Sequence, residues 1–141
     1  LPDLFYAPAE LHSMLGACDV VAIALPLTTR TRGIFDDAAF LAMKSSALLV
    51  NIARGDICDE AALTHALQDH QIAGAILDVF HQEPLPSEHP LWQLPNVFIS
   101  PHCSSLSALY KERAAQVCEE NVRRYLRNEP LYNLVDKDQE Y

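Results

Sequence analysis

The sequence predicts an α/β fold in which helices alternate with the strands of a parallel sheet. Four apolar runs suggest the strands, at residues 19–25, 47–53, 74–79 and 96–100. Segments with apolar residues at helical spacing separate the first three runs. Runs this apolar are typical of strands buried on both faces under helices, and the alternation predicts right-handed crossovers.

The first part of the chain is predicted to form helix, strand, helix and strand. A proline near its start and apolar residues at helical spacing predict a short helix over residues 8–15. Pro26 ends the first strand and begins a loop at residues 26–29. Asp36 can cap a second helix that continues through Met43 and ends before the next strand.

The second part of the chain repeats this alternation. Asp59 is a suitable N-cap for a helix over residues 60–68. Residues 84–95 are rich in proline and are expected to be irregular, with one helical turn near Trp92. A long helix with one apolar stripe is predicted over residues 105–128.

Composition and charge restrict the partners of the protein. The 141 residues suffice for one hydrophobic core, and 50% hydrophobic with 21% charged residues is ordinary for a globular domain. A net charge of −9 and a pI near 4.9 argue against nucleic acid and anionic membranes, which require basic surfaces. A small anionic substrate would need local positive groups.

The cysteines indicate a reducing compartment. Cys18, Cys58, Cys103 and Cys118 include no C-x-x-C pair, and there is no signal peptide or long apolar span. We therefore expect free thiols and a cytoplasmic protein. A zinc site built on Cys103 and His102 is disfavoured, because no second pair at ligand spacing supports it, and no metal is predicted.

Arg54 ends the apolar run at residues 47–53 abruptly. Burial of an unpaired charge costs roughly several kcal/mol, so Arg54 is expected at the rim beyond the carboxyl end of the strand. Open α/β sheets bind ligands at that rim, and a planar guanidinium suits a carboxylate, which makes Arg54 a candidate anion clamp. The alternative is a surface arginine paired with Asp56 or Asp59.

Glu83 and His102 follow the third and fourth predicted strands, so parallel topology can bring them together with Arg54. A carboxylate beside a histidine fixes its tautomer and stabilises the imidazolium, which suits proton transfer near neutral pH. The alternatives are a histidine bonded beneath a loop and a solvated carboxylate. An anion clamp beside an acid/base pair fits reduction of a 2-oxo acid, with the hydride supplied by a cofactor.

Five ordered motifs together resemble the D-isomer-specific 2-hydroxyacid dehydrogenases, a family that includes phosphoglycerate, glyoxylate/hydroxypyruvate and D-lactate dehydrogenases. They are Leu-Pro-Leu-Thr at 25–28, Leu-Val-Asn-Ile-Ala-Arg-Gly-Asp at 49–56, Asp-Glu-x-Ala-Leu at 59–63, Leu-Asp-Val-Phe-x-x-Glu-Pro at 77–84 and Ser-Pro-His at 100–102. The resemblance implies the C-terminal portion of a Rossmann-type NAD(P)-binding domain over residues 1–104. It also implies that residues 105–141 form a helix and tail that return toward a substrate domain.

The resemblance also implies roles for individual residues. Arg54 would bind the carboxylate and carbonyl of a small 2-oxo acid, His102 would be the acid/base, and Glu83 would orient His102. The nicotinamide and ribose of NAD or NADP would be contacted by Leu25, Pro26, Ile52, Ala53, Arg54, Asp78, His102, Cys103, Ser104 and Ser105. Asp78 has an alternative role as a cap for the following loop. A homodimer is expected for the intact enzyme.

The glycine-rich turn of the family, which holds the cofactor pyrophosphate, is expected upstream of Leu1. The four glycines of this chain, at positions 16, 33, 55 and 74, cannot assemble such a turn. We therefore expect the chain to be part of a longer enzyme and to be inactive by itself. Two alternatives stay open: a corepressor-like nucleotide-binding module and a degenerate fragment. The residues do not decide between NAD and NADP, or which 2-oxo acid is used.

Overall fold

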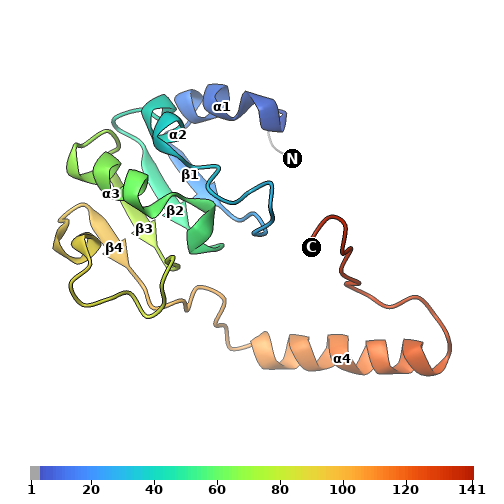
Figure 1. The fold of residues 1–141 in the computed structure, drawn as a ribbon. Helices are drawn as coiled ribbons and strands as arrows, with labels where there is room; N and C mark the ends of the chain where they lie inside the picture. Colours follow the sequence, from blue (N-terminus) through green and yellow to red (C-terminus); the bar gives the residue numbers. More distant parts are fainter. Residues whose placement is uncertain (1–3) are drawn as a thin grey trace. The chain divides into compact units, whose positions relative to one another are not determined.

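The computed structural model describes residues 4–141 of the chain. These residues fall into two compact units, which divide between His102 and Cys103. The first unit contains the sheet and the shorter helices, and the second contains the long helix α4 and the C-terminal segment (Figure 1).

The first unit is built on a four-stranded parallel sheet, as predicted, and the strand order in the sheet follows the sequence. At one edge Ile23 pairs with Asn51, Asn51 with Leu77, and Leu77 with Ile99, so all four strands end nearly level. The loops that follow them therefore leave from a single rim. The strands are β1 (Val20–Ile23), β2 (Leu48–Asn51), β3 (Gly74–Leu77) and β4 (Val97–Ile99).

The helices of the first unit confirm the predicted elements and their caps. Asp36 accepts a hydrogen bond from the backbone N–H of Ala39, and Asp59 accepts bonds from the N–H groups of Ala61 and Ala62. The elements are 3₁₀ turn η1 (Pro8–Glu10), α1 (Leu11–Ala17), α2 (Asp37–Ala42), 3₁₀ turn η2 (Gly55–Ile57), α3 (Glu60–Gln68) and 3₁₀ turn η3 (Pro90–Gln93).

The core lies on one face of the sheet, so the prediction that the strands are buried on both faces is wrong. Leu49 and Leu77 are almost fully buried and share a cluster with Phe40 of α2, whereas Leu48 and Ile76 are each 40% exposed. The crossovers between β1, β2 and β3 all step the same way across the sheet. Right-handed crossovers that step the same way place their helices on the same face.

The long helix of the second unit, α4 (Tyr110–Leu126), begins five residues later than predicted. Serines before it favour turns over helix, and backbone hydrogen bonds from Leu106 to Cys103 and from Tyr110 to Ser107 close two such turns. At the other end Asn128 adopts a φ of 55°, a left-handed conformation that commonly ends helices.

Candidate active site at the carboxyl edge of the sheet

Arg54 lies at the rim, three residues beyond the end of β2, and is exposed. Its Nη1 donates to the carbonyl oxygen of Ala53 at 2.7 Å. Within residues 4–141 Arg54 forms no ion pair: Asp56 pairs with Arg32, and Asp59 caps α3. The alternative of a surface arginine paired with either aspartate is therefore wrong, and the guanidinium is available for an external anion.

Glu83 and His102 are in direct contact, as the sequence predicted. Oε2 of Glu83 lies 2.7 Å from Nδ1 of His102, and Oε1 accepts the backbone N–H of Phe80 at 3.0 Å. Partial burial opposes ionisation of Glu83, but the hydrogen bonds from His102 and Phe80 outweigh it and lower its pKa, and the charge of Arg54 acts in the same direction. An ionised carboxylate can only accept, so Nδ1 of His102 carries a proton and Nε2 is the nitrogen left for chemistry.

Backbone geometry also positions His102. Its φ of 50° is left-handed, a conformation in which histidine is enriched, and its N–H donates to the carbonyl of Ser100 at 3.1 Å. This tight turn directly after β4 directs the imidazole toward the loop that carries Glu83. The side chains of His102 and Glu83 remain 44% and 36% exposed, so they are accessible to a ligand.

An apolar hollow of about 610 Å³ opens beside the Glu83–His102 pair. The walls of this hollow were not predicted from the sequence, although a tryptophan in a proline-rich loop was a usable signal. Displacement of water from this hollow by a ligand would strengthen the electrostatic interaction between the histidine and the carboxylate. Besides the pair itself, the lining consists of Phe80, Pro84, Leu85, Trp92, Ile99, Ser100 and Pro101.

The candidate cofactor residues of the first unit lie along the same rim. Leu25 and Ile52 are apolar but 45% and 47% exposed, as expected for side chains that meet an apolar ring. Ala53 is buried, and Asp78 is 1% exposed and accepts a 2.5 Å hydrogen bond from the hydroxyl of Ser100. Pro26 follows Leu25 at the rim, and Cys103, Ser104 and Ser105 lie in the turns before α4.

Asn51 is a site residue that the sequence analysis missed. Its buried side chain donates from Nδ2 to the carbonyl of Arg54 at 3.1 Å and accepts the N–H of Ala53 at 3.0 Å. These two bonds define the bend that turns Arg54 out of the sheet. A single polar residue at the end of an otherwise apolar strand was the signal for it.

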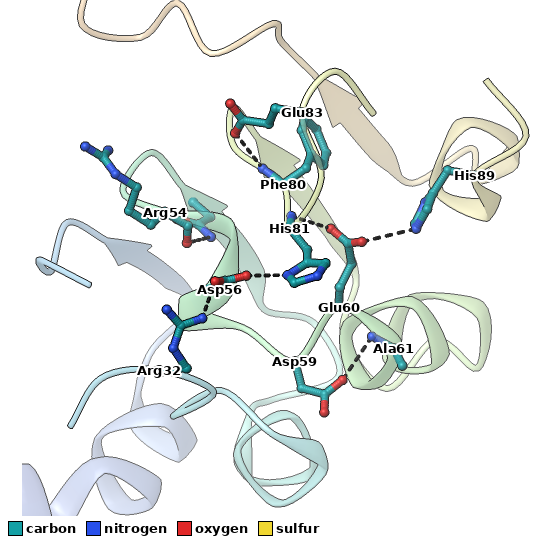
Figure 2. Close-up of polar contacts among 11 residues, drawn as sticks. Arg32, Arg54, Asp56, Asp59, Glu60, Ala61, Phe80, His81, Glu83 and His89 are labelled. Carbon is teal, nitrogen blue, oxygen red and sulfur yellow. Dashed lines mark hydrogen bonds and ion pairs between the residues drawn. The ribbon is translucent and has the colours of Figure 1, made fainter. Parts of the chain in front are cut away.

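A second polar cluster lies beside Arg54, around Asp56 (Figure 2). Its carboxylate pairs with Arg32 and also lies 2.5 Å from Nδ1 of His81. The hydrogen bond from His81, followed by that from Arg32, lowers the pKa of Asp56, and the Asp56 carboxylate raises the pKa of His81. From the sequence, Asp56 was expected only as a possible partner for Arg54.

Other chemistries find less support in the part of the chain that the structure describes. The Cys58 thiol is buried, which raises its pKa to about 12 and makes it a poor nucleophile. Residues 4–141 contain no group of three or more histidine, cysteine, aspartate or glutamate side chains placed to hold a metal ion. None of the helices described is long and apolar enough to span a membrane.

Comparison with known proteins identifies the family. The sequence model for the NAD-binding domain of the D-isomer-specific 2-hydroxyacid dehydrogenases matches residues 3–104. The chain belongs to this family. Its parallel sheet with covering helices is the Rossmann-type fold of the 2-hydroxyacid dehydrogenase NAD-binding domain, and the long α4 follows it.

Relatives within the 2-hydroxyacid dehydrogenase family include several reductases. The chain is 40% identical over 129 residues to a glyoxylate reductase of Thermofilum pendens, with 92% of this chain and 38% of the relative aligned. It is 42% identical over 127 residues to glyoxylate/hydroxypyruvate reductase B of Citrobacter koseri, covering 90% and 39%. A mitochondrial formate dehydrogenase of Solanum tuberosum is 37% identical over 133 residues, covering 93% and 35%. The chain thus spans about two fifths of the length of these relatives.

Solved structures of 2-hydroxyacid dehydrogenases have the same fold. A D-isomer-specific 2-hydroxyacid dehydrogenase of Xanthobacter autotrophicus, crystallised with NADPH and MES, superposes with a TM-score of 0.91 at 39% identity, covering 97% of this chain and 56% of that one. An NADPH-dependent glyoxylate/hydroxypyruvate reductase of Sinorhizobium meliloti, crystallised with NADP and sulfate, has a TM-score of 0.87 at 34% identity, covering 96% and 44%.

Proposed function

We propose that this chain forms part of an NAD(P)-dependent D-2-hydroxyacid dehydrogenase that reduces a small 2-oxo acid of the glyoxylate or hydroxypyruvate type. The observation that carries the proposal is the 2.7 Å contact between Glu83 and Nδ1 of His102. This pair lies at the same rim as Arg54, whose guanidinium forms no ion pair within residues 4–141. An acid/base pair and an anion clamp are the groups that this reduction requires.

Each of the three residues has a distinct role in the proposed reaction. Arg54 binds the substrate carboxylate and its neighbouring oxo oxygen through two N–H groups, which sets the orientation of the reacting carbon. His102 donates the proton on Nε2 to that oxygen as the alcohol forms. Glu83 stabilises the imidazolium before transfer and keeps Nδ1 protonated afterwards. A bound nicotinamide supplies the hydride.

The rim residues are proposed to hold the nicotinamide end of the cofactor. Leu25 and Ile52 present exposed apolar surface there, and Asp78 offers a buried acceptor between β3 and β4. The remaining proposed cofactor contacts are Pro26, Ala53, Arg54, His102, Cys103, Ser104 and Ser105. A homodimer in the cytoplasm is the expected form of the full-length enzyme.

Formate oxidation is the competing chemistry among the relatives, since one of them is a formate dehydrogenase. Loss of hydride from the formate anion gives carbon dioxide directly and transfers no proton to or from oxygen. A histidine held by a carboxylate would have no proton to deliver in that reaction. The Glu83–His102 pair therefore favours reduction of a 2-oxo acid.

The test is turnover by the full-length protein with NADH or NADPH and glyoxylate or hydroxypyruvate, and with NAD⁺ or NADP⁺ and formate. We expect oxidation of the reduced cofactor with at least one 2-oxo acid, and loss of most of this activity when His102 is replaced by Asn. Cofactor binding without turnover of any 2-oxo acid would instead support a nucleotide-binding module. Absence of both cofactor binding and turnover would support the alternative of a degenerate, inactive chain.

A further inference from the structure

Three rim loops meet at the carboxylate of Asp56. Asp56 lies in η2, two residues after Arg54, in the segment that follows β2. One of its partners, Arg32, comes from the loop after β1, and the other, His81, comes from the loop after β3, two residues before Glu83 (Figure 2). The same carboxylate thus ties the segment carrying Arg54 to the segment carrying Glu83.

The backbones of these two segments are also in close contact at Gly55. A Cβ built on Gly55 would lie 2.0 Å from the carbonyl carbon of Phe80 and 2.5 Å from the backbone nitrogen of His81. The N–H of Phe80 is the group that binds Oε1 of Glu83. A shift of the Arg54 segment would therefore be passed through Gly55 to the backbone of Phe80, the residue whose N–H binds Glu83.

Glu60, at the start of α3, supports the same loop from a further direction. One carboxylate oxygen accepts the backbone N–H of His81 at 3.0 Å, and the other lies 3.3 Å from Nε2 of His89. His81 is consequently held at its backbone by Glu60 and at its ring by Asp56. The Asp56 side chain is only 23% exposed, and its backbone carbonyl accepts the N–H of Gly33 at 2.8 Å.

We propose that Asp56 and His81 are positioning residues that hold Arg54 and Glu83 at the spacing that reduction of the 2-oxo acid requires. The catalytic consequence of this proposal rests on the proposed function, whereas the structural coupling between the two segments does not. Neither residue has to touch the substrate. Each acts through its neighbour two positions away in the chain, Asp56 on Arg54 and His81 on Glu83.

The coupling depends on the charge of His81. The charged groups that face its ring are the carboxylates of Asp56 and Glu60, which favour the imidazolium, and the guanidinium of Arg32, which opposes it. The balance raises the pKa of His81, with the hydrogen bond to Asp56 as the main cause. The ion pair is therefore formed below that raised pKa and weakens as the pH rises through it.

The structural coupling can be tested by NMR on the 141-residue chain without any assumption about activity. In the wild type, the amide signal of Phe80 should shift as His81 titrates, and in Asp56→Asn this shift should disappear and the ring signals of His102 should move. The control is Asp19→Asn, which removes the 2.9 Å ion pair with Lys44. If the Phe80 and His102 signals of Asp56→Asn match the wild type throughout the titration, the coupling does not exist.

The catalytic consequence can be tested by kinetics in the full-length enzyme. Asp56→Asn and His81→Gln should each lower kcat/KM for the 2-oxo acid by roughly 3- to 30-fold, because small displacements of catalytic groups are costly. His81→Arg keeps a cation beside Asp56 and should retain most of the wild-type kcat/KM. The fall in kcat/KM that accompanies deprotonation of His81 in the wild type should be absent from this variant. Asp19→Asn should stay within roughly twofold of the wild type.

The two measurements separate failure of this inference from failure of the proposed function. A wild-type enzyme that turns over a 2-oxo acid while Asp56→Asn and His81→Gln retain full kcat/KM would overturn the positioning role and leave the proposed function intact. A wild type that turns over no 2-oxo acid would overturn the proposed function and, with it, the catalytic part of the inference. The NMR titration would still decide the coupling in that case.

Discussion

The carboxylate of Glu83 and Nδ1 of His102 lie 2.7 Å apart although they belong to loops that follow two different strands, β3 and β4. The parallel pairing of these strands places their carboxyl ends side by side, so residues 19 positions apart in the chain come into contact. The same geometry explains why the charge of Arg54, which follows β2, acts on the Glu83 carboxylate.

Removal of the imidazole should abolish most turnover. In the full-length enzyme, His102→Ala should lower kcat by roughly 10²- to 10⁴-fold, which is the usual contribution of a positioned acid or base. Steady-state kinetics with NADPH and glyoxylate or hydroxypyruvate would measure it. His12→Ala, at an exposed histidine of α1, is the matched control and should leave kcat unchanged. An unchanged kcat in His102→Ala would refute the acid/base role.

Replacement of the guanidinium by an ammonium should weaken substrate binding. Arg54→Lys should chiefly raise KM for the 2-oxo acid, by roughly tenfold or more, because lysine loses the two-pronged contact with the carboxylate. The matched control is Arg113→Lys, which makes the same change at an exposed arginine of α4. An Arg54→Lys enzyme with unchanged KM would contradict the anion clamp.

The ion pair between Asp56 and His81 should stabilise the fold in a defined pH window. In the folded protein the pKa of Asp56 is lowered from its ordinary value of 3.8, and the pKa of His81 is raised from its ordinary value of 6.5. The stabilisation that comes from the ionised Asp56 is present above pH 3.8 and is lost in acid. The stabilisation that comes from the charged His81 is complete below pH 6.5 and is lost as the pH rises through the raised pKa.

Thermal unfolding as a function of pH would reveal this window. The difference in Tm between the wild type and Asp56→Asn should be largest between the two ordinary pKa values, 3.8 and 6.5, and should decrease on both sides. The corresponding difference for Asp19→Asn should not change between pH 6 and 8, since lysine keeps its charge there. A constant Tm difference for Asp56→Asn across this range would argue against the pair.

A methyl group at Gly55 should destabilise the first unit. Its Cβ would meet the backbone of Phe80 at 2.0 Å, and a backbone atom cannot rotate away as a side chain can. Gly55→Ala should therefore lower the free energy of unfolding by about 3 kcal/mol. Gly33→Ala is the control. A Cβ at Gly33 would meet no atom within 4 Å, so the only cost is that alanine must adopt a left-handed φ of 64°, which is about 1 kcal/mol. Chemical denaturation of both variants compares the two costs, and equal costs would show that the Gly55 contact is not tight.

The 141-residue chain by itself should bind dinucleotide weakly. Its four glycines form no phosphate-binding turn, and each charge-assisted hydrogen bond to a phosphate contributes roughly 1.5–3 kcal/mol. Calorimetric titration should find similar, weak affinities for NADPH and for nicotinamide mononucleotide, because both would use the rim near Leu25 and Ile52. Micromolar binding of NADPH by the isolated chain would show that other residues hold the pyrophosphate.

The sequence alone determined the features that depend on local chemistry. Apolar runs and their breaks predicted four parallel strands, and side chains able to accept from free backbone N–H groups, at Asp36 and Asp59, predicted where two helices begin. The cost of burying a charge predicted that Arg54 lies at the rim. Each of these inferences compares a residue with its near neighbours, so no distant contact is needed to make it.

Only the tertiary structure decided the features that depend on contacts between distant residues. The exposure of Leu48 and Ile76 follows from the direction of the crossovers, which residue patterns do not contain. The choice of Arg32 and His81, over the neighbouring Arg54, as partners of Asp56 arises in the same way. An ion pair forms where the backbone brings two groups within a few ångströms, and the packing of one loop against another sets that distance.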